Sequence, residues 1–247
     1  MKCLLLLSLV VYACLGRAYA AEPDTRCYEL RIYYAAPGKL DALEARFRDH
    51  TCKLFEKHGF TNIGYWAPLD NAENKLIYVI SSPSREAHDK AWKEFGADPE
   101  WKKVVQETEA NGKLVTRIDS IHLKATDFSP LITPSVQEPG RLFELRTYTA
   151  AAGKMDALLA RFRDYTLALF TKHGMTHIGY WTRTDEGTNQ LVYILAHKSK
   201  EAAEESWKAF RADPAWTEAK RASELNGSLT EKVESVLMSP VDFSPIK

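Results

Sequence analysis

The sequence predicts an α+β protein in which two tandem ferredoxin-like βαββαβ domains pack sheet to sheet. The first observation is an internal repeat, because Glu29-Leu30-Arg31 returns as Glu144-Leu145-Arg146 and 144 minus 29 gives an offset of 115. The second is that each copy reads strand, helix, strand, strand, helix, strand. In that order the helices cover only one face of an antiparallel sheet, so we expect the two bare faces to meet as a barrel-like sandwich.

The repeat sets the domain boundaries. The offset holds without a gap from the pair Cys27/Leu142 to the pair Pro130/Pro245. A period this long, present twice, indicates a duplicated domain rather than a solenoid of short units. We therefore expect a first domain over residues 27–130, a linker with prolines and a glycine over 131–140, and a second domain over 141–247.

Hydrophobic periodicity and capping residues predict the elements within one copy. Gly59 is expected to stop the first helix, Ser84 to cap the next one, and Asp98-Pro99 to start the last. The expected strands are 27–33, 60–66, 76–80 and 114–123, and the expected helices are 39–58, 84–95 and a segment that starts at 99 and ends near 111. The second copy is expected to repeat this order.

Composition indicates a globular protein and argues against nucleic acid as a partner. The chain has 247 residues, of which 45% are hydrophobic and 27% are charged, enough for two modest cores. Lysine plus arginine number 33, as do aspartate plus glutamate, so no net charge attracts phosphate backbones or anionic lipid.

The first twenty residues resemble a secretory signal peptide. Lys2 supplies a positive charge, Leu4 to Leu15 an apolar run, and Ala18-Tyr19-Ala20 a cleavage site before Ala21. Since a run of roughly a dozen residues is shorter than the ~20 that span a bilayer, we expect an exported protein, periplasmic or secreted, without a transmembrane segment. A lipid attached to Cys14 is the alternative, although Tyr12 fits that pattern poorly.

Removal of the leader would leave two cysteines in the mature chain. Cys27 and Cys52 align with Leu142 and Leu167, so each position accepts a plain apolar side chain. We expect both thiols to be buried and unpaired, while export leaves a disulfide open as an alternative.

The first strand of each copy supplies the candidate binding residues. Strand alternation places Glu29, Arg31 and Tyr33 on one face, which we expect to point into the barrel, with Tyr28, Leu30 and Ile32 toward the helices. The charged pair either orients a ligand or neutralises itself. The candidate ligand-binding residues are Glu29, Arg31, Tyr33, Trp66, Tyr78, Glu144, Arg146, Tyr148, Trp181 and Tyr193.

Two histidines end helices in equivalent places. His58 and His173 stand before a glycine, where an imidazole caps free carbonyls more often than it transfers protons or ligates haem. Metal-binding motifs, glycine-rich phosphate loops and nucleophile elbows are not found, so the sequence predicts no metal and no cofactor.

These motifs together resemble the NIPSNAP family over essentially the whole mature chain. The resemblance rests on Tyr28 to Tyr33, Pro37-Gly38, Lys57-His58-Gly59, Gly64-Tyr65-Trp66 and Trp92/Asp98-Pro99/Trp101, met twice in one order. It implies the dimeric α/β-barrel superfamily, whose members include cofactor-independent monooxygenases, haem-binding enzymes and small-molecule binders. The leader departs from the mitochondrial targeting segments of the best-known eukaryotic members.

Three functions remain open from the sequence. The first is binding of a small apolar molecule or a protein partner, including a second copy of the chain. The second is a cofactor-independent monooxygenase or isomerase, which requires a sizeable cavity lined by Glu29, Arg31, Tyr33 and their repeats. The third is haem binding through His58 or His173.

Overall fold

The computed structural model describes residues 24–137 and 140–247. The signal peptide, its cleavage site and Cys14 lie outside these residues. Within them, no helix combines the length and the hydrophobicity needed to cross a bilayer.

The first half follows the predicted order of elements. Its strands are β1 (Cys27–Ala35), β2 (Thr61–Pro68), β3 (Lys75–Ser82) and β4 (Val115–Ala125). The helices are α1 (Leu40–Arg46), η1 (Phe47–Thr51), α2 (Cys52–Lys57), α3 (Arg85–Ala97) and α4 (Pro99–Thr108). The first predicted helix thus contains one π-helical turn, η1, which lies between its two α-helical parts.

The second half repeats these elements. Its strands are β5 (Leu142–Ala150), β6 (Thr176–Arg183), β7 (Gln190–His197) and β8 (Thr230–Pro240). The helices are α5 (Met155–Arg161), η2 (Phe162–Thr166), α6 (Leu167–Lys172), α7 (Lys200–Ala212) and α8 (Pro214–Ser223). Caps explain the predicted helix starts, because Ser84 and Ser199 accept a bond from the third residue beyond them.

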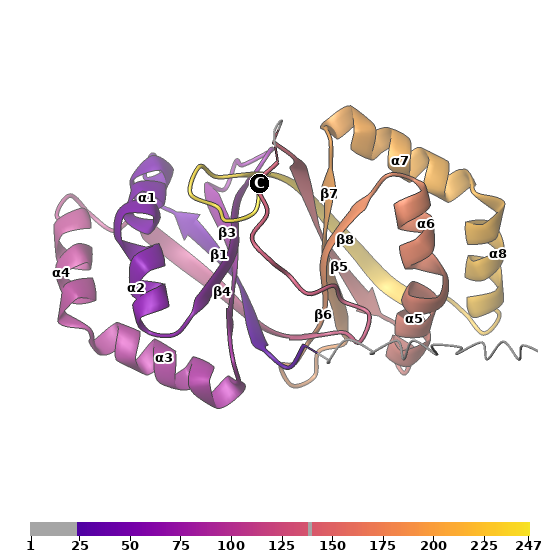
Figure 1. Cartoon of the computed structure of the whole chain (residues 1–247), viewed down its shortest axis with the longest axis horizontal. Helices are drawn as coiled ribbons and strands as arrows, with labels where there is room; N and C mark the ends of the chain where they lie inside the picture. Colours follow the sequence, from indigo (N-terminus) through magenta and orange to yellow (C-terminus); the bar gives the residue numbers. More distant parts are fainter. Residues whose placement is uncertain (1–23, 138–139) are drawn as a thin grey trace, which may run out of the picture.

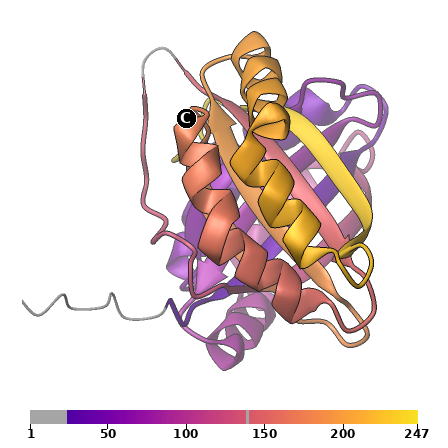
Figure 2. The same cartoon turned by 90° about the vertical axis from the view of Figure 1, so that its right-hand side faces the viewer.

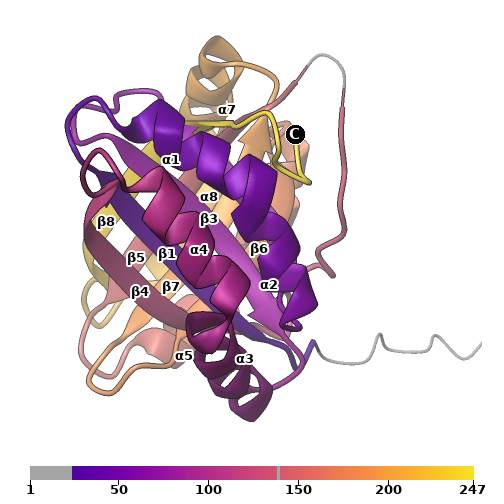
Figure 3. The same cartoon turned by 90° about the vertical axis from the view of Figure 1, so that its left-hand side faces the viewer.

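All eight strands form one closed antiparallel barrel in the order β1-β3-β2-β8-β5-β7-β6-β4. Each half contributes four adjacent strands, and two short seams close the barrel, β2 with β8 and β4 with β6. Figure 1 shows the two sheets back to back with the helices outside, and Figures 2 and 3 show the helices of each half covering its own sheet. The predicted fold class is confirmed.

The barrel interior is packed with apolar side chains from both sheets. Tyr28 and Leu30 lie in this cluster together with Phe143 and Leu145 of the other half. Ile132 joins them, so the segment between the two repeats also contributes to the core, and Ser135 forms an isolated bridge with Ile246. The interior is therefore a shared hydrophobic core of the two halves.

The Gly-Tyr-Trp motif of β2 and β6 is explained by this core. The indoles of Trp66 and Trp181 are fully buried in it, and each folds back over the glycine two residues earlier. A Cβ on Gly64 would overlap the Trp66 ring, and one on Gly179 would overlap Trp181. The intervening tyrosines, Tyr65 and Tyr180, point to the helices instead.

Candidate functional site

The structure reverses the predicted faces of the first strand. Tyr28, Leu30 and Ile32 belong to the barrel core, whereas Tyr33 packs with the helix-side cluster and Glu29 bonds to side chains of α3. The prediction that Glu29, Arg31 and Tyr33 line the interior is therefore wrong. The physical reason is that a buried carboxylate needs donors, and the helices supply them while the barrel supplies hydrocarbon.

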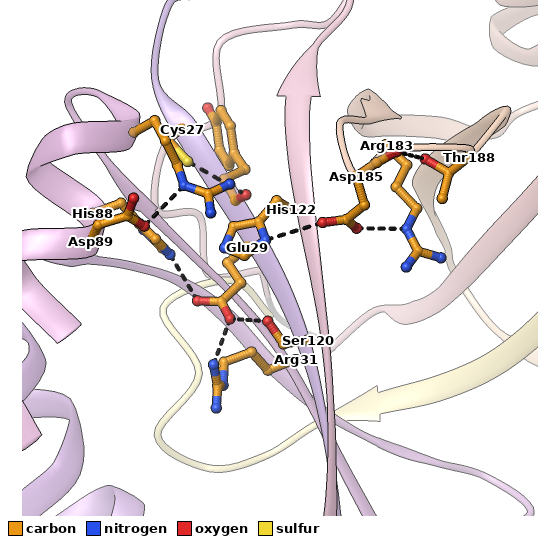
Figure 4. A network of polar contacts seen from close by, with 12 residues as sticks. Cys27, Glu29, Arg31, His88, Asp89, Ser120, His122, Arg183, Asp185 and Thr188 are labelled. Carbon is orange, nitrogen blue, oxygen red and sulfur yellow. Dashed lines mark hydrogen bonds and ion pairs between the residues drawn. The ribbon is translucent and has the colours of Figure 1, made fainter. Parts of the chain in front are cut away.

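Glu29 is the centre of a buried polar cluster in the first half. Its Oε2 accepts hydrogen bonds from Trp92 Nε1 at 2.7 Å and lies 2.9 Å from His88 Nε2. Its Oε1 accepts from Arg31 Nη1 and Ser120 Oγ, both at 2.5 Å. Arg31 in turn lies over the Trp92 ring at 4.3 Å. Figure 4 shows Arg31 of β1, His88 of α3 and Ser120 of β4 around this carboxylate.

Glu144 has the same surroundings in the second half. Its Oε2 accepts from Trp207 Nε1 at 2.6 Å and lies 3.0 Å from His197 Nε2. Its Oε1 accepts from Arg146 Nη1 and Ser235 Oγ, both at 2.6 Å. Each glutamate is thus almost fully buried with four hydrogen-bonding partners, which removes most of the desolvation cost.

The two imidazoles come from different positions of the repeat. His88 lies on α3 and its repeat partner is Ala203, whereas His197 ends β7 and its repeat partner is Ser82. Ser82 Oγ lies 3.2 Å from His88 Nδ1, so the serine and histidine of the first half occupy the space that His197 fills in the second. The Glu–His contact has therefore been kept although its sequence position differs.

These partners control the ionisation of the glutamates. Burial alone raises the pKa of Glu29, but the hydrogen bond from His88, the charge of Arg31 and the bond from Ser120 lower it to about 2. Burial likewise raises the pKa of Glu144. The bond from His197, the charge of Arg146 and the bonds from Ser235 and Trp207 together lower this pKa to about 2. Both carboxylates are ionised at neutral pH and hold their arginines in place.

Arg146 lies on the wall of a cleft of about 550 Å³ in the second half. The cleft is bounded by β5 and β8 on one side and by α7 and α8 on the other, which Figure 2 shows side by side. Its aromatic lining consists of Tyr148, Trp207, Phe210 and Trp216. Val233 of β8 is 45% exposed and forms an open apolar edge.

Basic side chains surround this cleft. Besides Arg146, they are Arg211, Lys220 and Arg221, against one acid, Glu224. Glu224 is neutralised by Arg161 at 2.8 Å, and Arg221 pairs with Glu218 at 2.6 Å. The repeat partners of Arg211, Lys220 and Arg221 are the uncharged Gly96, Val105 and Gln106, whereas Thr217 of the cleft corresponds to Lys102, so the two halves place their basic side chains at different positions.

The other predicted binding residues lie in different parts of the structure. Trp66 and Trp181 lie inside the barrel and are wholly enclosed. Tyr78 and Tyr193 are fully buried in the helix-side clusters, where burial raises their pKa well above the ordinary value. Of the ten candidates, only Arg146 and Tyr148 line the cleft described above.

His58 and His173 connect two helices rather than capping their own. His58 Nε2 lies 2.7 Å from Asp98 Oδ2, and His173 Nε2 lies 2.8 Å from Asp213 Oδ2. Asp98 and Asp213 are themselves the N-caps of α4 and α8. Hydrogen bonds from Lys57 and then His58 lower the pKa of Asp98. The nitrogen that would ligate haem is therefore engaged in a structural contact in both halves.

Cys27 and Cys52, the cysteines within the described part of the chain, are free thiols and are half-buried in the first half. Burial raises the pKa of Cys52 to about 11 and also raises that of Cys27. Neither thiol has the character of a nucleophile.

Several residues of the glutamate clusters could not be recognised from the sequence. Trp92 and Trp207 lie on α3 and α7 and donate to the carboxylates. His88 and His197 break the repeat, so comparing the two copies conceals them. His122 of β4 was one of seven scattered histidines, and it stands opposite Glu29 in the sheet.

Comparison with known proteins decides the family. The NIPSNAP family model matches residues 28–130 and again residues 143–245. The chain belongs to the NIPSNAP family. This NIPSNAP protein thus carries two copies of the family domain, which confirms the resemblance found in the sequence. No curated protein is similar enough to count as a match.

Solved structures share the fold of this NIPSNAP protein. A putative monooxygenase from Lactobacillus acidophilus has 13% identity, a TM-score of 0.54, and coverage of 88% of this chain and 94% of its own. An anthrone oxidase-like protein has 14% identity, a TM-score of 0.58, and coverage of 92% and 96%. A NIPSNAP protein of unknown function from Agrobacterium tumefaciens has 26% identity, covers 45% of this chain and 98% of its own, and has a TM-score of 0.40. At these identities the two full-length matches show the fold alone.

Proposed function

We propose that this NIPSNAP protein binds a small organic anion with an apolar ring or acyl body in the cleft of its second half. The observation that carries the proposal is the combination of an aromatic wall and a basic rim around about 550 Å³ of space. That volume lies within the range of small-molecule sites. The aromatic side chains would take the apolar body of the ligand and the basic side chains its charge.

The difference between the halves supports a role in binding rather than in folding. The Glu–Arg–Trp cluster is present in both halves and is part of the scaffold that the two copies share. Arg211, Lys220 and Arg221 replace Gly96, Val105 and Gln106 on the same scaffold, so folding does not require these charges. Arg211 and Lys220 add positive charge to the cleft wall, while Arg221 is paired with Glu218, and this excess of positive charge favours an anionic ligand.

The packed interior argues against the enzyme hypothesis in its original form. That hypothesis requires a cavity inside the barrel lined by Glu29, Arg31 and Tyr33, and these residues lie outside it. A ligand of this chain is therefore proposed for the outer cleft, on the helix side of the sheet.

Two fluorescent probes test the proposal. Anilinonaphthalene sulfonate carries an aromatic body and a negative charge, and N-phenylnaphthylamine has the same body without the charge. We expect the sulfonate to bind saturably with one site per chain. The variant R211G/K220V/R221Q copies the first half and should weaken sulfonate binding about tenfold, or ~1.4 kcal/mol, while leaving the neutral probe unchanged.

The control variant K90Q/K93Q/K103Q removes the same charge from exposed positions of α3 and α4 in the first half. It should bind both probes as the unmodified chain does. Equal affinity of the sulfonate for all three proteins would contradict the proposal, and so would its failure to bind at all. In that case a protein partner or a second copy becomes the better hypothesis.

We also propose that the protein is exported, with residues 1–20 removed. The charge, the apolar run and the Ala18-Tyr19-Ala20 site support this. N-terminal sequencing of the protein from its own host should start at Ala21. A chain that starts at Met1, or one acylated at Cys14, would overturn it.

A further inference from the structure

Glu29, His88 and His122 form a compact cluster of potential metal ligands at the outer end of β1. One nitrogen of each imidazole and one carboxylate oxygen all lie within 4.8 Å of one another. The three residues come from β1, α3 and β4, so their linear spacing gives no metal motif. Figure 4 shows the two rings on either side of the glutamate, where their centroids are 5.5 Å apart.

Both imidazoles are held by a second contact through Nδ1. His88 Nδ1 lies 3.2 Å from Ser82 Oγ, and His122 Nδ1 lies 3.3 Å from Asp185 Oδ1. Asp185 is fixed in turn by Arg183 Nε at 2.7 Å. This is the arrangement of metal-binding histidines in proteins, where one ring nitrogen bonds to an oxygen and the other is left for the metal. Nε2 of His122 is thereby left for a ligand, whereas Nε2 of His88 lies 2.9 Å from Glu29 Oε2 and 3.1 Å from Trp92 Nε1, contacts that a bound ion would replace.

The carboxylate divides its two oxygens between different tasks. Oε1 takes Arg31 and Ser120, whereas Oε2 accepts one bond from Trp92 Nε1 and faces His88 Nε2. Oε2 is therefore the atom that could bind a metal while Oε1 keeps its present partners. The side chain of His122 is 19% exposed, which gives an ion a route into an otherwise buried cluster.

The second half lacks the third ligand. The repeat partner of His122 is Leu237, and Leu237 stands opposite Glu144 as His122 stands opposite Glu29. Glu144 has all four of its hydrogen-bonding partners without a second imidazole. His122 is therefore not needed to satisfy the buried glutamate, and the contact of its Nδ1 with Asp185 leaves its other ring nitrogen unused.

We propose that Glu29, His88 and His122 bind one divalent transition-metal ion, with Zn²⁺ as the preferred ion. Two imidazole nitrogens and one carboxylate oxygen are a ligand set that Zn²⁺ accepts, with a further position open to water. The ion takes the place of the present contact between His88 Nε2 and Glu29 Oε2. Ser82 and Asp185 act as positioning residues. The site is distinct from the anion cleft of the second half and does not depend on it.

Metal titration of the untagged mature chain tests this inference. The protein is first dialysed against a chelator and then titrated with Zn²⁺ by calorimetry and with Co²⁺ by visible absorption. We expect one ion per chain, a visible Co²⁺ band, and a melting temperature raised by Zn²⁺. H122L installs the residue that the second half already carries, so it should fold normally and lose stoichiometric binding. D185N should bind about tenfold more weakly.

The second half offers a gain-of-site variant. L237H places an imidazole opposite Glu144 and near His197, and Asp70, the repeat partner of Asp185, lines the same surface cleft as Leu237. We expect L237H to bind two ions per chain. Folded wild-type protein that takes up no stoichiometric metal would overturn the proposal. An H122L variant that binds as the wild type does, or an L237H variant that still binds only one ion, would also count against it.

Discussion

His88 and His197 make the same contact from non-equivalent positions of a duplicated domain. Each places Nε2 within about 3 Å of the buried glutamate of its own half, one from helix α3 and the other from the end of β7. The imidazole is therefore required at a place in the fold rather than at a place in the sequence. The reason is the buried glutamate. It has four hydrogen-bonding partners in each half, and without the imidazole it would have only three.

Moving the histidine of the first half from position 88 to position 82 should preserve stability, whereas removing it should not. H88A removes a hydrogen bond to a buried charge and should lower the free energy of unfolding by about 2 kcal/mol. S82H/H88A copies the arrangement of the second half and should recover most of that loss. Urea unfolding of the two variants measures the difference. Equal stability of H88A and S82H/H88A would show that the two histidines are not equivalent.

The ion pair of the second half predicts a pH dependence of stability. The pKa of Glu144 is lowered from 4.5 to about 2, so its contribution is complete above about pH 4.5 and is lost as the pH falls toward 2. At pH 7, E144Q should be less stable than the wild type by roughly 3 kcal/mol, because Arg146 keeps a buried charge. The difference should shrink steadily in urea unfolding between pH 5 and pH 3. A constant difference would contradict this account.

The glycines beneath the barrel tryptophans should tolerate no side chain. A Cβ at Gly64 or Gly179 overlaps an enclosed indole, so G64A and G179A should each cost about 2 kcal/mol or more. G96A is the control, because a Cβ there meets nothing and α3 should gain about 0.5 kcal/mol. Thermal unfolding followed by tryptophan fluorescence distinguishes these cases. A G64A variant as stable as G96A would show that the indole can move.

Two substitutions of Asp98 should distinguish its contribution as the N-cap of α4 from the contribution of its negative charge. D98N keeps an oxygen for the amide of Glu100 and loses the salt bridge with Lys57 and the negative charge that faces His58, whereas D98A loses the cap as well. We expect the melting temperature to fall further for D98A than for D98N. If the two variants melt together, the cap contributes little and the ionic contacts explain the effect.

The architecture of this protein was largely predictable from its sequence, because strand alternation, capping residues and a long repeat all indicate the same fold. The orientation of β1 was not. Alternation separates the two faces of a strand but does not say which one turns to the other sheet. Hydrophobicity leads to a wrong assignment here, because Glu29 finds its donors only on the helix side.

The candidate sites were predictable only in part. Arg146 and Tyr148 were identified because the repeat draws attention to them, and both line the cleft. Arg211, Lys220 and His122 were not, because each of them differs from its repeat partner. In a duplicated chain, similarity between copies reports mainly on folding, and the residues that distinguish the copies are better candidates for function.

Both halves belong to one chain, and Ile132 of the connecting segment lies inside their shared core. This covalent connection changes how a single mutation affects the barrel. In a homodimer each substitution appears twice, so a charge that suits one site is imposed on its twin. Here a substitution appears once. Gly96 could stay while Arg211 arose, and Leu237 could stay beside His122, so the two halves were free to acquire different chemistry within one symmetric barrel.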